Sequence, residues 1–554
     1  MATMTSRRRL AVPVLVLALA AAAVLTHPSV PARAASSDQD LIKSACALPH
    51  EYLLRTWRGW RPDRGAQLSF IPKEPNFVGS GLPHVGPWDY IQHVPMLWYG
   101  PGFIKPQPQV NRPVTVAGIA PTVAHILKFD GYTAPDGQPM DEALVPGVTT
   151  QPKLIVTMVW DAGGMNVLEA HPNSWPYLKS LIPKGTFFTD TTVGSSPTST
   201  AQIHATIGSG AFPDHHGLVG HHMEVGGKLT TPWNNGPSFF VEPTLADLYD
   251  RAMGNKPVVG IVGTVDIHFG MLGHGAFFNG GDQDIALTRS VTGGDTLTDE
   301  GFTWNLPARD AGYYYVPPYA NDVPGFAQDV KKVDQADGKL DGKWRDNEIE
   351  PLLKGFDTPA RTPYQQRVVE AVVKNEHFGK DDTTDLLYLN FKEIDYISHI
   401  WSMNSPEMQD AVVAQDLALK RLVAFLNQQV GKGEWVLALT ADHASMPDPA
   451  VSGGYQISTA PMQTMINEKF DTDGDNIPIV DLMQPTQAFL NVDELAQNGY
   501  TVADVARYMM TFTQAQTAGG GVVPLPGQDN VTVMEAAFPS AMMQDLPCLP
   551  EARA

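Results

Sequence analysis

Six residues in four short segments carry side chains that bind metal ions or attack a phosphate. Carboxylates and imidazoles are zinc ligands, and Asp395 and His399 would share one face of a helix, as two ligands of one ion must. The hydroxyl-rich segment 196–210 leads into an expected helix, whose N-terminal amides would attract an anion. Taken singly, each segment also fits a helix cap, a helix start or a surface pair. The six residues are Asp161, Thr200, Asp395, His399, Asp442 and His443.

Four apolar runs have the length and the endings of buried parallel strands; they span residues 154–160, 258–262, 386–391 and 435–440. Helix-like periodicity lies between them, for example over 363–374 and 406–428. Strands alternating with helices indicate a doubly wound α/β sheet, which binds ligands beyond the carboxyl ends of its strands. We therefore expect all four segments on one rim of the sheet.

The segment 200–220, TAQIHATIGSGAFPDHHGLVG, carries a resemblance to the alkaline phosphatase superfamily and, within it, to the type I phosphodiesterase/nucleotide pyrophosphatase branch. The similarity covers 153–263 and 385–508. It implies an alkaline-phosphatase-like α/β fold: a doubly wound, mostly parallel sheet with helices on both faces and an inserted cap. The aromatic and glycine-rich stretch 264–384 is expected to form that cap.

The resemblance also implies a two-metal site. It assigns the first ion to Asp161, Thr200, Asp442 and His443. It assigns the second ion to Asp395, His399 and one further histidine, which in the family lies near the C-terminus.

No histidine follows His443 in this chain. The family's closing segment consists of a histidine loop, an apolar strand and a helix that opens with Ala-Pro-Thr. That order occurs instead at His84, at 94–102 (VPMLWYGPG) and at 120–127 (APTVAHIL). The chain is thus expected to be circularly permuted, with His84 as the missing ligand.

Permutation would place the new chain ends near Cys46 and Cys548, the only two cysteines, which are then expected to form a disulfide. The expected divisions are a signal peptide at 1–34, a permuted segment completing the core at 35–129, a linker at 130–151, the first part of the catalytic core at 152–263, the cap at 264–384 and the second part of the core at 385–554.

The function that the resemblance implies is phosphoric ester hydrolysis through a phospho-threonine intermediate at Thr200. Nitrogen and oxygen ligands without thiolate favour two zinc ions, with manganese or iron as alternatives. His221 stands where the family has a phosphate-binding asparagine and is expected to donate the same hydrogen bond. The expected substrate is a small-molecule phosphate ester or a nucleotide.

The N-terminal segment has the pattern of a cleavable secretory signal: Arg7–Arg9, an apolar run over 10–25 and an alanine-rich site at Ala34. Both the general and the twin-arginine routes fit. A formal net charge of −21 argues against binding to nucleic-acid backbones. No later run is apolar enough to span a membrane, so an exported protein, secreted or periplasmic, is expected. Its oligomeric state stays open.

Other functions on the same fold remain open. A phosphomonoesterase of the alkaline phosphatase type, a cofactor-independent mutase, a phosphonoacetate-type hydrolase or a non-catalytic binding protein would each fit. A sulfatase is disfavoured, because the arginine after Cys548 comes one place too late for the required motif. In the cap, Phe277, Phe278, Trp304 and the tyrosines at 313–315 suggest an aromatic slot for a diester substituent, although such aromatic residues more often belong to the core.

One acidic run resembles a calcium loop. Asp471, Asp473 and Asp475 alternate along the chain as the first ligands of an EF-hand do. The spacing that would complete an EF-hand is missing, so the sequence favours a solvated turn.

Overall fold

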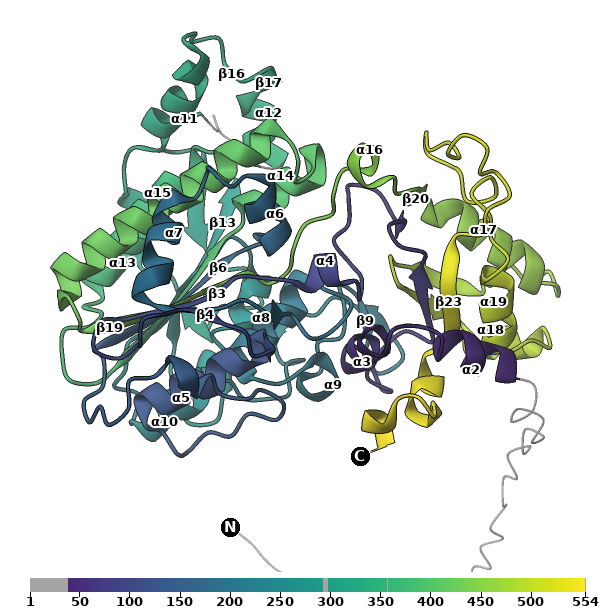
Figure 1. The fold of residues 1–554 in the computed structure, drawn as a ribbon, viewed down its shortest axis with the longest axis horizontal. Helices are drawn as coiled ribbons and strands as arrows, with labels where there is room; N and C mark the ends of the chain where they lie inside the picture. Colours follow the sequence, from purple (N-terminus) through teal and green to yellow (C-terminus); the bar gives the residue numbers. More distant parts are fainter. Residues whose placement is uncertain (1–37, 292–296, 356, 554) are drawn as a thin grey trace, which may run out of the picture. The chain divides into compact units, whose positions relative to one another are not determined.

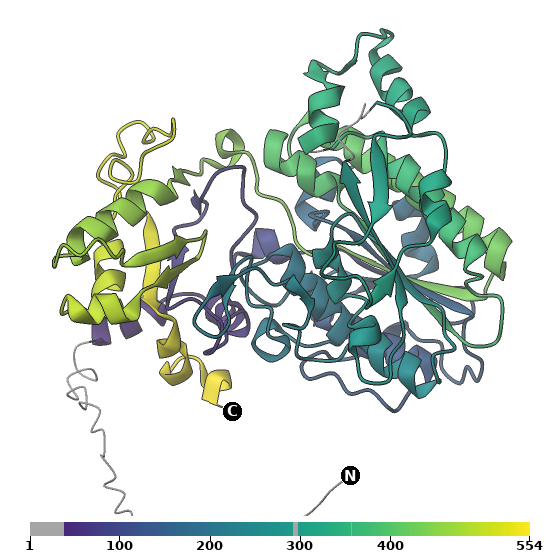
Figure 2. The same cartoon turned by 180° about the vertical axis from the view of Figure 1, so that it is seen from behind.

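The computed structural model describes residues 38–291, 297–355 and 357–553. The expected signal peptide at 1–34 lies outside these residues. Residues 41–554 form one compact unit, whose elements are labelled in Figure 1 and seen from behind in Figure 2. Across the described ranges, no helix is both long and apolar enough to span a membrane.

A mostly parallel sheet forms the centre of the fold, with the strand order β14-β13-β12-β18-β6-β19-β3-β7-β4 and β15 beside β13. The four apolar runs are its central parallel strands: β12 (Val259–Val262), β18 (Asp385–Phe391), β6 (Leu154–Trp160) and β19 (Trp435–Thr440). The flanking strands are β13 (Asp284–Val291), β14 (Phe302–Asn305), β15 (Tyr314–Tyr315), β3 (Met96–Tyr99), β7 (Thr186–Phe188) and β4 (Gln107–Val110). The predicted doubly wound sheet is confirmed.

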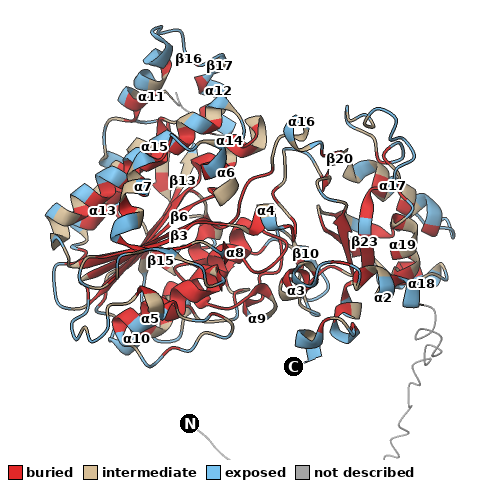
Figure 3. Cartoon of the chain, viewed as in Figure 1, coloured by how far each residue is buried: buried red, intermediate tan, exposed pale blue. Residues whose placement is uncertain are grey.

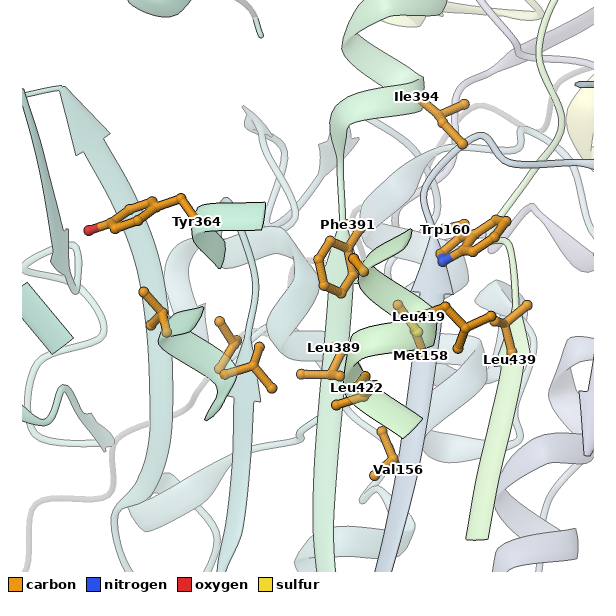
Figure 4. Packing of buried hydrophobic residues seen from close by; sticks show 14 of the residues in the cluster. Val156, Met158, Trp160, Tyr364, Leu389, Phe391, Ile394, Leu419, Leu422 and Leu439 are labelled. Carbon is orange, nitrogen blue, oxygen red and sulfur yellow. The ribbon is translucent and has the colours of Figure 1, made fainter. Parts of the chain in front are cut away.

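Alternate residues of the central strands pack into two apolar layers, one on each face of the sheet. On β6, Val156 and Met158 belong to one layer, and Ile155 and Val159 to the other. Figure 4 shows Val156 and Met158 in one cluster with Leu419 and Leu422 of a covering helix, and Figure 3 shows the buried strands between partly exposed helices. The first face is covered by α7 (Pro176–Leu181), α13 (Arg361–Asn375) and α15 (Pro406–Leu426), and the second by α5 (Ile119–Leu127), α8 (Thr200–Ser209) and α10 (Leu245–Ala252).

The N-terminal segment expected to complete the core is part of the large sheet. β3 lies between β19 and β7 and pairs antiparallel with both. All four of its residues are buried, with Leu97 in one apolar layer and Trp98 in the other. The expected linker also packs against the core, since Met140 and Ala143 are buried in the second layer.

The stretch 264–384 differs from the expected cap. β13 and β14 extend the large sheet at one edge, and α13 covers one of its faces. The projecting part is smaller and contains α11 (Phe326–Asp334), the hairpin β16 (Lys343–Trp344) and β17 (Asn347–Glu348), and α12 (Ile349–Gly355) (Figure 1). β13 pairs on both sides, with β12 on one and with β14 and β15 on the other, but its sequence DIALTRSV mixes apolar and polar residues and so lacks the continuous apolar run of the central strands.

Residues 456–539 also differ from expectation, because they do not continue the large sheet. They build most of a second, antiparallel sheet in the order β21-β22-β1-β23. Its strands are β21 (Val480–Met483), β22 (Gln487–Leu490), β1 (Leu68–Pro72) and β23 (Met534–Pro539). The helices α17 (Thr459–Phe470), α18 (Val492–Gln497) and α19 (Val502–Met509) contribute to the apolar core of this second sheet.

The predicted disulfide between Cys46 and Cys548 is confirmed, with the two Cα atoms 5.7 Å apart. The bond joins residues separated by 502 positions and therefore restricts the unfolded chain strongly. Replacing both cysteines by serine is expected to lower the free energy of unfolding by about 2–5 kcal/mol. Denaturant unfolding measures this, with reduced wild-type protein as the control. Equal stability of the variant and the oxidised wild type would contradict the prediction.

Candidate active site

The predicted site residues meet at the carboxyl ends of three neighbouring strands. Asp161 follows β6, and Asp442 and His443 follow β19. After β18 the chain enters α14 (Glu393–Trp401), which carries Asp395 and His399 on one face. Because β18, β6 and β19 are parallel neighbours, their ends bring these segments to one rim, as expected.

The ligands assigned to the first ion lie close together and are buried. Asp161, Asp442 and His443 each place one ligand atom within 4.8 Å of the others. His443 Nε2 is 3.2 Å from Asp442 Oδ2 and 3.7 Å from Asp161 Oδ1. The backbone amide of Ala162 donates to Asp442 Oδ1 at 3.0 Å and so orients this carboxylate.

The ligands assigned to the second ion also converge. His84 Nε2 is 3.1 Å from Asp395 Oδ1, and His399 Nε2 is 3.5 Å from the same oxygen. The His84 ring stacks on the His443 ring, with centroids 3.6 Å apart. The structure thus places His84 beside both expected ligand groups, although it is more than three hundred positions from Asp395.

Backbone carbonyls set the orientation of both histidines around Asp395. His84 Nδ1 is 3.2 Å from the carbonyl oxygen of Thr198, and His399 Nδ1 is 2.6 Å from that of Gly81. Since a carbonyl only accepts, each Nδ1 carries a proton, and each Nε2 can direct a lone pair toward an ion. Burial and the nearby His443 lower the pKa of His84 to about 4, which keeps this imidazole neutral.

Three buried atoms in this cluster make no hydrogen bond of acceptable geometry with the described residues, although Asp395 Oδ1 lies 3.1 Å from His84 Nε2 and Asp442 Oδ2 lies 3.2 Å from the third atom, His443 Nε2. Buried polar atoms rarely stay unsatisfied. Burial opposes protonation of His443, yet Asp442 raises its pKa to about 9, so the carboxylates attract positive charge here. The donor set therefore fits divalent metal ions bound by nitrogen and oxygen.

Lys392 is a site residue that the sequence analysis missed. Its Nζ lies 2.9 Å from Asp161 Oδ1 and 2.7 Å from Asp395 Oδ2, and it donates to Thr200 Oγ1 at 3.1 Å. Burial alone would lower the pKa of Lys392, but Asp161 and Asp395 raise it above its ordinary value. The ammonium therefore links the nucleophile to one carboxylate of each ligand group. Its position three residues before Asp395 was the available signal.

Asn390 and two further histidines support Asp161. Asn390 Nδ2 donates to Asp161 Oδ2 at 2.9 Å and to His204 Nε2 at 2.8 Å. His204 Nδ1 in turn donates to the carbonyl of Thr200 at 2.8 Å. His268 Nε2 lies 3.4 Å from Asp161 Oδ2, and burial lowers its pKa to about 4. These neutral rings fix Asp161 and the start of α8.

A cavity of about 820 Å³ opens over these residues. Among the described residues that line it, Lys392 is the one lysine or arginine, and much of the wall is apolar, including Val265, Ile267 and Ile400. The lining does not include the aromatic residues that suggested a slot, Phe277, Phe278, Trp304 and the tyrosines at 313–315. Trp304 instead packs in the core of the large sheet.

His221 lines the same cavity as Thr200. Burial, His222 and Lys392 lower the pKa of His221, so its ring is neutral at pH 7 and can donate one N–H. The hydrogen bond that it was expected to make to phosphate remains a prediction.

Comparison with known proteins adds three findings. The sequence model of the family described as type I phosphodiesterase / nucleotide pyrophosphatase matches residues 155–542. A Myroides odoratus protein named calcium-transporting ATPase is 24% identical over 399 residues, which cover 63% of this chain and 71% of that protein. The alkaline phosphatase PafA of Elizabethkingia meningoseptica is 26% identical over 162 residues, 28% of this chain and 29% of that protein.

The crystal structure of wild-type alkaline phosphatase PafA is also similar to this chain. It has a TM-score of 0.48 and 18% identity, and the match covers 70% of this chain and 85% of the other.

Proposed function

This chain belongs to the type I phosphodiesterase/nucleotide pyrophosphatase family and is a phosphoric ester hydrolase, and from that premise we propose that it cleaves phosphodiesters through a phospho-threonine intermediate at Thr200. The observation that carries the proposal is the position of Thr200. Its buried hydroxyl begins α8 and lies at the cavity, beside Lys392 and both groups of ligands.

In this proposal Asp161, Thr200, Asp442 and His443 would hold one metal ion, and Asp395, His399 and His84 would hold the other. When bound, two divalent ions, for which the nitrogen and oxygen donors favour zinc, would neutralise phosphate oxygens and acidify the attacking and departing groups.

The residues of the chain supply the remaining steps. The Thr200 hydroxyl oxygen attacks phosphorus, the bond from phosphorus to the ester oxygen breaks, and the alcohol leaves with a proton. Lys392 stabilises the negative charge that develops on Thr200 Oγ1, and the first amides of α8 face the anion. His221 donates its N–H to a phosphate oxygen. Water then attacks phosphorus, the bond from phosphorus to Thr200 Oγ1 breaks, and one proton of the water returns to Thr200 Oγ1.

The diester preference follows from charge. A monoester dianion needs more positive charge than a diester, and the ammonium of Lys392 is already shared by two carboxylates. The apolar wall of the cavity suits an organic substituent, such as a nucleoside. A phosphomonoesterase is the second candidate, supported by the similarity to a protein named alkaline phosphatase.

A rate comparison on two chromogenic substrates tests this function. The kcat/KM for a nitrophenyl ester of thymidine monophosphate is expected to exceed that for nitrophenyl phosphate by at least about tenfold, which corresponds to about 1.4 kcal/mol. Dialysis against a chelator should abolish both activities, and zinc should restore them. A reversed preference would assign the chain as a phosphomonoesterase. No turnover by the zinc-loaded protein would favour a non-catalytic binding protein.

We also propose that the chain is circularly permuted relative to its family. The family match begins at residue 155, whereas His84, β3 and α5 precede it. The disulfide joins the regions where permutation would have opened the chain. A variant that connects the two ends and opens the chain within 130–151 should fold and retain activity.

Export is a further part of the proposal. It is supported by the basic and apolar pattern over 1–34 and by the disulfide, a bond typical of oxidising compartments. N-terminal sequencing of the protein recovered from outside the cytoplasm should find a chain that begins just after Ala34.

A further inference from the structure

The loop between α17 and β21 brings four carboxylates together on the second sheet, away from the residues assigned to the active site. Asp471, Asp473, Asp475 and Glu494 each place one carboxylate oxygen within 4.8 Å of the others. The three aspartates lie in the loop, whereas Glu494 comes from α18 (Figure 1). The cluster therefore joins two elements that are separated in the sequence by the β21–β22 hairpin.

Glu494 is buried in a way that an acidic surface turn does not explain. Its side chain points into the cluster, and the residue is 1% exposed. Oε1 accepts a hydrogen bond from Asn498 Nδ2 at 2.6 Å, but Oε2 is buried without any hydrogen-bond partner among the described residues. A buried carboxylate oxygen beside three like charges is costly unless a cation compensates it.

The chemistry of the cluster selects the cation. Every ligand is a carboxylate oxygen, and no nitrogen or sulfur belongs to the set. Four carboxylates on a loop and a helix favour calcium, which accepts many oxygens in flexible geometry, over zinc.

We propose that Asp471, Asp473, Asp475 and Glu494 form a calcium site. The alternating aspartates correspond to the first three ligands of an EF-hand loop, and the glutamate that the sequence spacing lacked comes from α18. This replaces the solvated turn that the sequence favoured. The bound ion ties the start of the β21–β22 hairpin to α18.

The hairpin connects this site to the active-site cavity. Val480, the first residue of β21, donates its backbone N–H to Asn467 Oδ1 of α17 at 2.9 Å. The turn of the hairpin, residues 484–487, lines the cavity. We therefore expect calcium to stabilise this wall without taking part in the chemistry at Thr200.

The test is calcium binding by the full chain in the presence of saturating zinc, which keeps the active-site ligands occupied. Equilibrium dialysis with radioactive calcium should find one bound ion per chain. Calcium chloride should raise the thermal unfolding midpoint by about 2 °C or more, and magnesium chloride should raise it less. Glu494→Gln should weaken calcium binding about tenfold or more, since ligand charge sets the affinity.

Asp493→Asn provides the matched control, because Asp493 is exposed on the same helix and lies outside the cluster. It should bind calcium as the wild type does. If Glu494→Gln does not fold, Asp473→Asn tests the same prediction at an exposed ligand. The proposal is overturned if wild type binds no calcium, if magnesium stabilises equally, or if the cluster variants bind as tightly as the control.

Discussion

Thr200→Ala is expected to reduce kcat/KM on the preferred nitrophenyl ester by about 10³-fold or more, because it removes the attacking oxygen itself. The protein should still fold, since Thr200 begins α8 and alanine is a good helix former. Rapid acid quenching followed by mass spectrometry should detect phosphorylated Thr200 in the wild type and not in the variant. Thr200→Ser, which keeps a hydroxyl, should retain more activity than Thr200→Ala.

Ser199→Ala is the matched control for this experiment. Ser199 precedes Thr200, lines the same cavity and is also buried, but its hydroxyl hydrogen-bonds to the side chain of Gln202. The rate of this variant should stay within about tenfold of wild type, because the hydroxyl at position 200 is kept. If Ser199→Ala loses turnover while Thr200→Ala keeps it, the nucleophile has been assigned to the wrong residue.

The fold was predictable where strands are buried on both faces. The runs that became β6, β18, β12 and β19 are continuous and apolar, so they could be read from sequence alone. The second sheet could not be read in this way. β1 pairs with β22 and β23, which lie more than four hundred positions further along the chain. No local sequence pattern encodes such a pairing.

The location of the candidate site could be predicted from residue types that have few roles other than metal binding or catalysis at such positions. Adjacent Asp442 and His443 after a buried strand are ligand-type residues, and only together with the other three segments did they predict a site at one rim of the sheet. Lys392 gave no comparable signal, because a lysine after a strand usually lies on the surface. Its partners Thr200 and Asp161 are 192 and 231 positions away, so that only the folded chain shows the contact.

Lys392→Met is expected to lower kcat/KM by about 10²-fold, with the metal content unchanged or increased. The substitution keeps a long side chain but removes the charge that contacts Thr200 Oγ1, and lost electrostatic stabilisation of this kind typically costs that much. Metal binding should not weaken, because the ammonium now competes for the carboxylates of Asp161 and Asp395.

Comparison with His84→Ala distinguishes stabilisation of the nucleophile by Lys392 from the role of a metal ligand. Losing a ligand should lower both the rate and the metal content, by about one ion per chain, whereas Lys392→Met should lower the rate alone. Elemental analysis of both variants, combined with steady-state kinetics, distinguishes the two. If Lys392→Met turns over like wild type, or if its metal content falls as in His84→Ala, Lys392 does not stabilise the nucleophile. If Lys392→Met keeps its metal and loses its rate, the Lys392 ammonium, which contacts Asp161, Asp395 and Thr200, acts on the step in which the Thr200 hydroxyl attacks.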